Sequence, residues 1–288
     1  MNILLTGATG QLGSDLKQEL QRRNHTVYGF GSRDLDITDA QAVSESIHRL
    51  CPDAVMHCAA YTAVDMAEEE RELCERINRQ GTENIARVCG EMNCKMLYIS
   101  TDYVFSGGGV RPWEPDDAAA PLNFYGLTKY RGEEAVRRSV PKHFIVRTSW
   151  VFGVHGKNFV KTMLRLSKER EQLTVVNDQI GSPTYTRDLS VLLADMIGSE
   201  KYGTYHAANE GYCSWYDFAS AIIQKSGRKT KVLPVSSDAY PTKAVRPLNS
   251  RMSKEKLVEN GFSKLPDWED ALNRFLVELE EENGNTHD

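Results

Sequence analysis

The sequence has no long apolar run. None of its hydrophobic segments approaches the roughly 20 residues that a helix needs to span a bilayer, although 40% of the 288 residues are hydrophobic. The opening segment MNILLTG is too short and too uncharged for a secretory signal. We therefore expect a soluble, cytoplasmic protein without a membrane partner.

Long blocks of one charge sign are also missing. The 35 basic and 40 acidic residues are interspersed and leave a net charge of −5. This pattern argues against a general affinity for nucleic acid or anionic membranes, so a bound anion must be held by a local site. The six cysteines form no CxxC pair, and no Cys/His cluster has metal-ligand spacing. We expect reduced, mostly buried thiols and assign no metal ligands.

The first half of the chain alternates short apolar or β-branched runs with longer helical patterns. Strands are predicted at 2–6, 26–31, 53–58, 95–100 and 143–148, with helices at 12–23, 39–50, 66–92 and 124–138. This alternation is typical of a parallel sheet wound through crossover helices. The fold prediction is α/β: a doubly wound, parallel-sheet Rossmann domain over residues 1–150 and a smaller α/β substrate-binding domain mainly over 151–288.

After residue 150 the alternation becomes less regular. A helix is predicted near 157–169, a strand at 173–176 and a helix near 186–197, followed by short elements separated by glycine and proline. We expect the chain to return to the first domain's sheet at about 170–200. No internal repeat is present.

A glycine-rich turn follows the first predicted strand. It reads Gly7-Ala8-Thr9-Gly10-Gln11-Leu12-Gly13, a GxxGxxG pattern that opens a helix. Glycines let the backbone approach a pyrophosphate, and the free N–H groups at the start of the helix meet its charge. Three glycines could also form a simple tight turn, but the position between strand and helix favours a dinucleotide site.

The end of the second predicted strand bears on the choice of cofactor. An NAD-binding unit has an acidic residue there for the ribose 2′-hydroxyl, whereas this chain has Ser32 and Arg33. Arg33 is suited to the 2′-phosphate of NADP, so the sequence favours NADPH. The alternative is a solvated Arg33 with Asp34 or Asp36 on the ribose, which would permit NADH.

Tyr125 and Lys129 form a YxxxK pair, and their side chains share one face of a predicted helix. A free tyrosine has a pKa of about 10, too high for efficient proton exchange at neutral pH. A lysine charge, together with that of an oxidised nicotinamide, lowers this pKa. Because many long helices contain YxxxK, the pair alone is weak evidence for catalysis.

The segment around Thr101 strengthens that evidence. It leaves the fourth predicted strand at its carboxyl end, where open α/β sheets bind ligands. The Thr101 hydroxyl beside Tyr125 would give two donors to a carbonyl oxygen that gains charge during hydride transfer. The alternative is a strand-end turn that satisfies its own backbone.

Several segments together resemble the dTDP-4-dehydrorhamnose reductases, a family of extended short-chain dehydrogenases/reductases. They are the glycine loop, LDITD at 35–39, CAAYTAVD at 58–65, STDYVF at 100–105, the YxxxK pair, RTSW at 147–150 and NDQIGSPT at 177–184. The resemblance covers essentially the whole chain, and STDYVF, RTSW and NDQIGSPT are its most specific parts. It implies NADPH-dependent reduction of the C4 ketone of dTDP-4-dehydro-L-rhamnose to dTDP-L-rhamnose.

The resemblance also implies roles for individual residues. Those assigned to the cofactor are Gly10, Gln11 and Leu12 at the pyrophosphate, Asp36 and Ile37 at the adenine, and Ala59, Ala60 and Tyr61 after the third strand. Those assigned to the sugar are Thr101, Asp102 and Trp150. Tyr125 would donate the proton, and Lys129 would position the tyrosine and the cofactor.

A nucleotide sugar brings a diphosphate, and the second half of the chain offers cations for it. The candidates are Lys157, Lys161 and Arg165 with Asn158 near one helix start, and Arg246 in a proline-flanked stretch. An arginine can clamp a diphosphate with two hydrogen bonds, although a solvated cationic face is the alternative. The polar residues at 178–184 could recognise the thymine base of the substrate, or they could simply connect a strand to a helix.

Other polar or aromatic features have simpler interpretations. We expect His57 to be a hydrogen-bonded core histidine, and the run 68–70 (EEE) to be a solvated face that suits a helix start. Trp215, Tyr216 and Phe218 are expected in the core of the second domain, with ligand contact as the alternative.

The resembled family includes members described as using Mg²⁺ at a dimer interface. Asp15 and Asp188 are the acidic candidates in this chain, but the sequence does not supply a full ligand set. The sequence is compatible with a homodimer but does not specify the oligomeric state.

Two other functions are compatible with the motifs. One is an epimerase or dehydratase with tightly bound NAD, although Tyr103 stands where dehydratases carry an acidic pair after the fourth strand. The other is a non-catalytic NADP-binding subunit, similar to the regulatory subunit of methionine adenosyltransferase. The intact Thr101, Tyr125 and Lys129 favour an enzyme, and net consumption of NADPH would distinguish a reductase from both alternatives.

Overall fold

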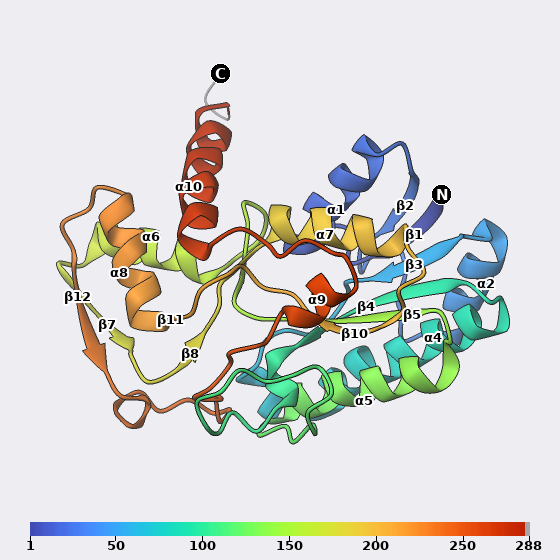
Figure 1. Cartoon of the computed structure of the whole chain (residues 1–288), viewed down its shortest axis with the longest axis horizontal. Coiled ribbons are helices and arrows are strands. Elements are labelled where there is room, and N and C mark those ends of the chain that lie inside the picture. The colour runs from blue at the N-terminus through green and yellow to red at the C-terminus, as the bar shows by residue number, and fades with distance from the viewer. Residues whose placement is uncertain (286–288) are drawn as a thin grey trace.

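The computed structural model describes residues 1–285, and its centre is a six-stranded parallel sheet (Figure 1). The strands are β1 (Asn2–Thr6), β2 (Thr26–Phe30), β3 (Ala54–His57), β4 (Lys95–Thr101), β5 (His143–Thr148) and β10 (Gly203–His206). They lie in the order β2-β1-β3-β4-β5-β10. Because the winding direction reverses between β1 and β3, a crevice is expected at their carboxyl ends, where such sheets bind ligands.

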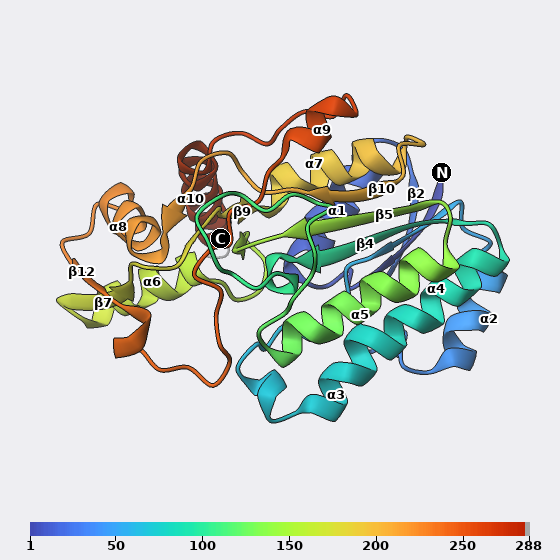
Figure 2. The same cartoon turned by 60° about the horizontal axis from the view of Figure 1, so that its bottom comes forward.

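Helices cover both faces of this sheet (Figures 1 and 2). One face carries α1 (Gln11–Arg22) and α7 (Thr186–Ile197), and the other carries α2 (Ala40–Leu50), α4 (Thr82–Glu91) and α5 (Phe124–Ser139). Alternate residues of β1 supply both layers, since Ile3 and Leu5 pack on the first face and Leu4 on the second. This arrangement confirms the predicted doubly wound α/β Rossmann fold.

A second group of elements lies beyond the carboxyl ends of the strands (Figure 1). Its helices are α6 (Phe159–Glu169), α8 (Trp215–Lys225) and α10 (Trp268–Asn285). Its two-stranded sheets pair β6 (Val151–Phe152) with β9 (Thr184–Tyr185), β7 (Gln172–Val176) with β12 (Lys231–Val235), and β8 (Ile180–Gly181) with β11 (Cys213–Ser214). Phe152, Phe218 and Phe275 are fully buried in their shared core. The short helix α9 (Glu255–Glu259) instead packs on the large sheet, because Leu257 belongs to the core that lies between the sheet and α7.

The chain returns to the large sheet through α7 and β10, while β7 stays with β12 in the second group. The domain division near residue 150 remains our interpretation, and residues 286–288 of the second domain lie outside the described part of the chain. Within residues 1–285, no helix has both the length and the apolar character needed to cross a bilayer. Four of the six free cysteines are buried, as expected.

The helix predicted over 66–92 is confirmed from Arg71 to Glu91, but it starts later and is not uniformly α-helical. The chain forms a 3₁₀ turn at Met66–Glu68, a short helix α3 at Arg71–Glu75, a π-helical turn at Arg76–Gly81 and then α4. A Cβ atom on Gly81 would lie 2.7 Å from the Ile37 side chain, so this turn needs glycine to pack against the loop after β2. The wide turn also buries Asn78, whose partners lie far along the chain.

Candidate active site

The glycine loop forms a cradle with no space for side chains. Gly7 has φ +68°, and a Cβ atom there would lie 2.7 Å from the Ala59 nitrogen. A Cβ atom on Gly13 would lie 2.0 Å from the Gly7 carbonyl oxygen. Helix α1 begins at Gln11 without a capping side chain, so its first N–H groups and its positive end are available to an anion. This cradle fits a dinucleotide pyrophosphate.

Gln11 joins this loop to the second group of elements. Its amide nitrogen donates to the Val151 carbonyl at 3.2 Å, and its amide oxygen accepts from Asn158 at 2.7 Å. Asn158 also caps α6, because its side-chain oxygen accepts from the Lys161 N–H. The sequence placed Asn158 among candidate diphosphate ligands, and the structure brings it to the pyrophosphate side of the cofactor loop.

Arg33 lies just after the carboxyl end of β2 and is free to bind a ligand. Its side chain is exposed and makes no hydrogen bond or ion pair within the described residues. The Asp34 carboxylate instead accepts from the Gly31 N–H at 2.8 Å. The Asp36 carboxylate accepts from the N–H and hydroxyl of Thr38, and these bonds lower its pKa. Both carboxylates are therefore engaged locally, which favours the arginine as the group that meets the cofactor's ribose.

The loop after β3 is held from two sides. The Ala59 N–H donates to the Thr6 hydroxyl at 3.3 Å. Asn78 accepts from the Tyr61 N–H at 2.8 Å, and its amide donates to the Tyr61 carbonyl and to the Thr128 hydroxyl at 3.1 Å each. Since Thr128 belongs to α5, Asn78 connects the cofactor loop with the helix that carries Tyr125. The sequence gave no signal for Asn78, because its partners are 17 and 50 residues away.

Tyr125 lies in the first turn of α5, beside the end of β4. Its ring meets that of Tyr103 edge to face, with centroids 5.7 Å apart. Burial and the neighbouring Asp102 charge raise the pKa of Tyr125, and the nearby Thr101 hydroxyl opposes them. The phenol therefore keeps its proton in the free protein, as a proton donor requires.

Thr101 and Asp102 form one hydrogen-bonded unit next to this phenol. The Thr101 hydroxyl donates to Asp102 at 2.9 Å and accepts from the Tyr103 N–H at 3.2 Å. Burial raises the pKa of Asp102 to about 6, and hydroxyls of Ser250 and Thr101 partly offset this effect. A carboxyl group that is ionised at neutral pH can accept hydrogen bonds from sugar hydroxyls.

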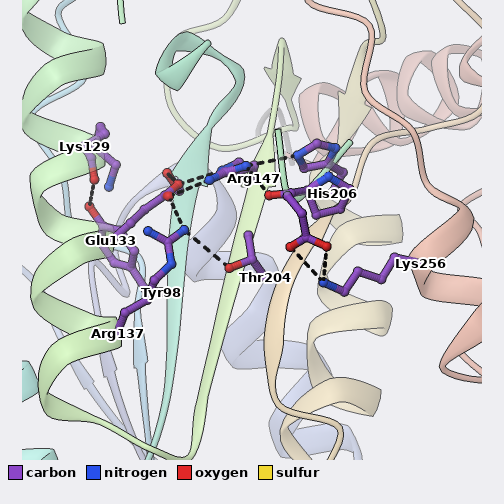
Figure 3. A network of polar contacts seen from close by, with 11 residues as sticks. Tyr98, Lys129, Glu133, Arg137, Arg147, Thr204, His206 and Lys256 are labelled. Atoms are coloured by element: carbon purple, nitrogen blue, oxygen red, sulfur yellow. Dashed lines mark hydrogen bonds and ion pairs between the residues drawn. The ribbon is translucent and has the colours of Figure 1, made fainter. Parts of the chain in front are cut away.

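Lys129 is 2% exposed, and its Nζ atom lies 4.1 Å from the centre of the Tyr98 ring. Burial lowers the pKa of Lys129 to about 7, and the negative charge of Glu133 opposes this effect. Glu133 is itself fully buried and accepts from Arg147 through Nε and Nη2 at 2.8 Å each (Figure 3). The spacing Lys129, Glu133 repeats the four-residue step of YxxxK, and this extension was missed in the sequence.

Trp150 occupies a strained backbone position after β5. Its φ is +48°, in the left-handed region that residues other than glycine rarely adopt. Its ring stacks on that of Trp215 with centroids 3.7 Å apart and an interplanar angle of 13°. As expected, Phe218 is buried in the second core, and Trp215 and Tyr216 are partly buried and pack against it.

The diphosphate candidates separate into two groups. Arg246 donates to Asp65 at 2.8 Å and to the Tyr103 hydroxyl at 3.2 Å, so it contacts the same tyrosine as Tyr125 does. Arg165 instead pairs with Glu169 on an exposed helix surface, and Lys161 donates to the Gly156 carbonyl at 3.3 Å. Arg246 alone is brought to the Tyr125 side of the site. Lys157 is exposed.

The segment 178–184 supports the structure around Trp150. Asp178 accepts from the N–H and hydroxyl of Ser237, and the Thr184 hydroxyl donates to the Ser149 carbonyl at 2.6 Å. A Cβ atom on Gly181 would lie 2.9 Å from the Trp150 ring, so glycine allows the ring to lie against this turn. The structure thus supports a role in shaping the site.

His57 is a core histidine, as expected. Its ring nitrogens lie 2.7 Å from the Thr6 hydroxyl and 3.1 Å from the Thr82 hydroxyl. Burial lowers its pKa to about 3, so the ring is neutral at physiological pH.

The two acidic metal candidates do not converge. Asp15 accepts from the Thr186 hydroxyl, and Asp188 pairs with Arg274 through both oxygens at 2.6 and 2.7 Å. Among residues 1–285 no group of three His, Cys, Asp or Glu side chains is arranged to hold a metal ion.

Comparisons with known proteins identify the family. The family model described as RmlD substrate binding domain matches residues 1–281. The dTDP-4-dehydrorhamnose reductase of Escherichia coli (strain K12) is 41% identical over 97% of this chain and 98% of its own. The spore coat polysaccharide biosynthesis protein SpsK of Bacillus subtilis (strain 168) is 40% identical over 96% and 97%. A crystal structure of dTDP-4-dehydrorhamnose reductase from Bacillus anthracis with NADP is 45% identical, has a TM-score of 0.94, and aligns over 96% of this chain and 100% of its own.

Proposed function

This chain belongs to the family described as RmlD substrate binding domain, and from that membership we propose that it reduces the C4 ketone of dTDP-4-dehydro-L-rhamnose with NADPH, forming dTDP-L-rhamnose. The observation that supports the proposal is that Thr101 ends β4 next to Tyr125 in the first turn of α5, with Lys129 one helical turn further along that helix. The glycine cradle opens on the same carboxyl edge of the sheet as Thr101, because all six strands are parallel. A dinucleotide and a carbonyl can therefore meet there.

Residues of the first domain would bind NADPH. The N–H groups from Gly10 to Gly13 would meet the pyrophosphate, Asp36 and Ile37 would lie at the adenine, and Ala59 to Tyr61 would line the next section. Arg33 would pair with the 2′-phosphate, because it is exposed at the end of β2 and has no protein partner there. When bound, NADPH supplies the hydride from C4 of its nicotinamide. Lys129 would hold the nicotinamide ribose and keep Tyr125 in place.

The sugar would bind between Thr101, Asp102 and Trp150. As the C4 carbon gains the hydride, the C4 oxygen gains the Tyr125 proton, so the carbonyl becomes an alcohol. The Thr101 hydroxyl and the phenol would stabilise the negative charge that develops on the oxygen. Arg246 is our candidate for the diphosphate, since its guanidinium reaches the Tyr103 hydroxyl beside the proton donor.

The direct test is an NADPH-oxidation assay with enzymatically prepared dTDP-4-dehydro-L-rhamnose, followed by identification of the sugar product. We expect one NADPH to be consumed for each dTDP-L-rhamnose formed. Protein that binds NADPH but never oxidises it with this ketosugar would contradict the proposal and would favour a regulatory subunit. Turnover without net NADPH consumption would instead favour an epimerase or dehydratase.

The proposed NADPH preference is tested at Arg33. A charge-assisted hydrogen bond contributes about 1.5–3 kcal/mol, so Arg33→Ala should raise the KM for NADPH roughly 10- to 100-fold. The KM for NADH should stay unchanged, because NADH lacks the 2′-phosphate. Equal KM values for NADPH and NADH in the wild-type protein would contradict this role.

A further inference from the structure

The sequence suggested that Glu68 is part of a solvated acidic face, but its carboxylate has partners within the protein. One of its carboxylate oxygens accepts from the Phe124 N–H at 2.7 Å. The other pairs with Arg71 at 2.8 Å, and the Arg71 guanidinium lies 5.1 Å from the centre of the Phe124 ring. The Glu68 side chain is 19% exposed. Both oxygens of this carboxylate therefore have defined partners, one of which is the backbone of another element.

That backbone is the start of the catalytic helix. Phe124 is the first residue of α5, and Tyr125 is the second. Asn123 caps the Gly126 N–H at 2.8 Å, so Asn123 and Glu68 each satisfy one of the N–H groups that a helix leaves unpaired at its start. A carboxylate also suits the positive end of the helix. The two caps thus hold the backbone on both sides of Tyr125.

We propose that Glu68 is a positioning residue that orients the Tyr125 phenol by anchoring the first N–H of α5. This role rests on the proposed function, because Tyr125 donates a proton only in that reaction. The anchor comes from 56 residues earlier in the chain. It therefore connects the segment after the cofactor loop with the helix that carries the proton donor.

The two neighbouring carboxylates differ from Glu68. Glu70 accepts from the Tyr61 hydroxyl at 2.6 Å, so it contacts a residue that we assign to the cofactor. Glu69 pairs with Lys243, but both side chains are about half exposed, and such pairs contribute little. The three adjacent glutamates should therefore affect different kinetic parameters.

The decisive comparison is between Glu68→Ala and Glu68→Gln. The alanine variant loses the acceptor and should lower kcat about 10-fold, because small misplacements of a reacting group have large effects on rate. Its KM for the ketosugar and its Kd for NADPH should stay within about twofold of wild type, because ground-state binding is not altered. The glutamine variant keeps an acceptor oxygen and should retain kcat within about threefold of wild type.

Two further variants show whether the effect is local. Glu72 is exposed on α3 and has no side-chain partner among the described residues, so Glu72→Ala is the matched control. It should behave like wild type. Glu70→Ala should instead raise the Kd for NADPH about threefold and leave kcat near wild type, because it loosens Tyr61 and not α5. Thermal unfolding of every variant separates these effects from loss of the fold.

Hydrogen exchange at the Phe124 N–H provides a test that does not depend on turnover. Exchange should be faster in Glu68→Ala than in wild type and Glu72→Ala. An active wild type together with a Glu68→Ala variant that has normal kcat and normal exchange would overturn the positioning role and leave the proposed function intact. An inactive wild type would overturn the proposed function, and the exchange rates would still show whether Glu68 anchors α5.

Discussion

Tyr125 and Lys129 lie one helical turn apart, yet burial changes their pKa values in opposite directions. It raises that of the phenol and lowers that of the ammonium group to about 7. Burial disfavours the charged form of each group, and this form is the phenolate for tyrosine and the ammonium for lysine. Tyr125 therefore stays protonated throughout the physiological range, while Lys129 changes its charge near neutrality.

The pH dependence of the reaction should follow from this difference. Lys129 is cationic below its pKa of about 7 and neutral above it. Since the cation is the form that holds the ribose and stabilises the phenolate, kcat/KM should fall as the pH rises through about 7. Measuring kcat/KM at low substrate concentration from pH 5.5 to 9 checks this prediction, because this range includes pH values below and above the lysine pKa. A constant kcat/KM up to pH 9 would exclude Lys129 as the titrating group.

Tyr125→Phe removes the proton donor but keeps the ring that packs against Tyr103. We expect kcat to fall by roughly 10²- to 10⁴-fold, the usual effect of losing a general acid. The Kd for NADPH, measured by fluorescence titration, should change little. A variant with kcat within threefold of wild type would remove Tyr125 from the mechanism.

At the scale of elements, the glycine loop and α1 are in close backbone contact. Gly13 lies where the helix meets the Gly7 carbonyl, and a Cβ atom would approach that oxygen to 2.0 Å. Because this oxygen is part of the Gly7 backbone, no side-chain rotation can relieve the contact. Either the loop or the helix must shift.

Gly13→Ala should therefore weaken NADPH binding by about 10-fold or more, which is roughly 1.4 kcal/mol. Gly198→Ala is a suitable control, because Gly198 has φ −72° and its nearest contact would be an ordinary 3.5 Å. Fluorescence titration of both variants with NADPH measures the difference. Equal affinity in Gly13→Ala and wild type would show that the loop adapts without loss.

At the scale of the whole molecule, a buried ion pair joins the catalytic helix to the sheet (Figure 3). Glu133 of α5 accepts from Arg147 of β5 and from the Ser100 hydroxyl of β4 at 2.6 Å. Arg147 also donates to the Pro115 carbonyl at 3.0 Å. Glu133 also pairs with Arg137 at 2.7 Å, and the Arg137 side chain is 34% exposed. Removing Arg147 therefore leaves the Glu133 charge with one partly exposed cation in a low-dielectric interior.

Arg147→Met should lower the free energy of unfolding by up to about 3 kcal/mol, the lower end for broken buried pairs, because Arg137 still pairs with Glu133. The double variant Glu133→Gln, Arg147→Met should recover part of this loss, because the one cation that loses its partner, Arg137, is 34% exposed and can be solvated. Urea unfolding of the two variants and the wild type measures both effects. If the double variant were less stable than Arg147→Met, the Glu133 charge left without Arg147 could not be the cause.

Features that depend on short-range chemistry were predicted well from the sequence. Strands buried on both faces need continuous apolar residues, which is why β1 and β5 were found with their observed bounds. The glycine loop was recognisable because its backbone geometry excludes a side chain at Gly7 and Gly13, which lie within seven consecutive residues. The YxxxK pair needs only helical spacing.

Features that depend on contacts between distant segments could not be predicted. The helix expected over 66–92 contains a π-helical segment, and Asn78 in this segment bonds to Tyr61 and Thr128. The anchoring of α5 by Glu68 joins residues that are 56 positions apart. The sequence by itself determined the Rossmann fold, because local backbone and burial requirements specify it, and it supplied the candidate reacting residues through their spacing. Only the tertiary structure decided what holds those residues in place, because hydrogen bonds between separate elements depend on how the chain packs.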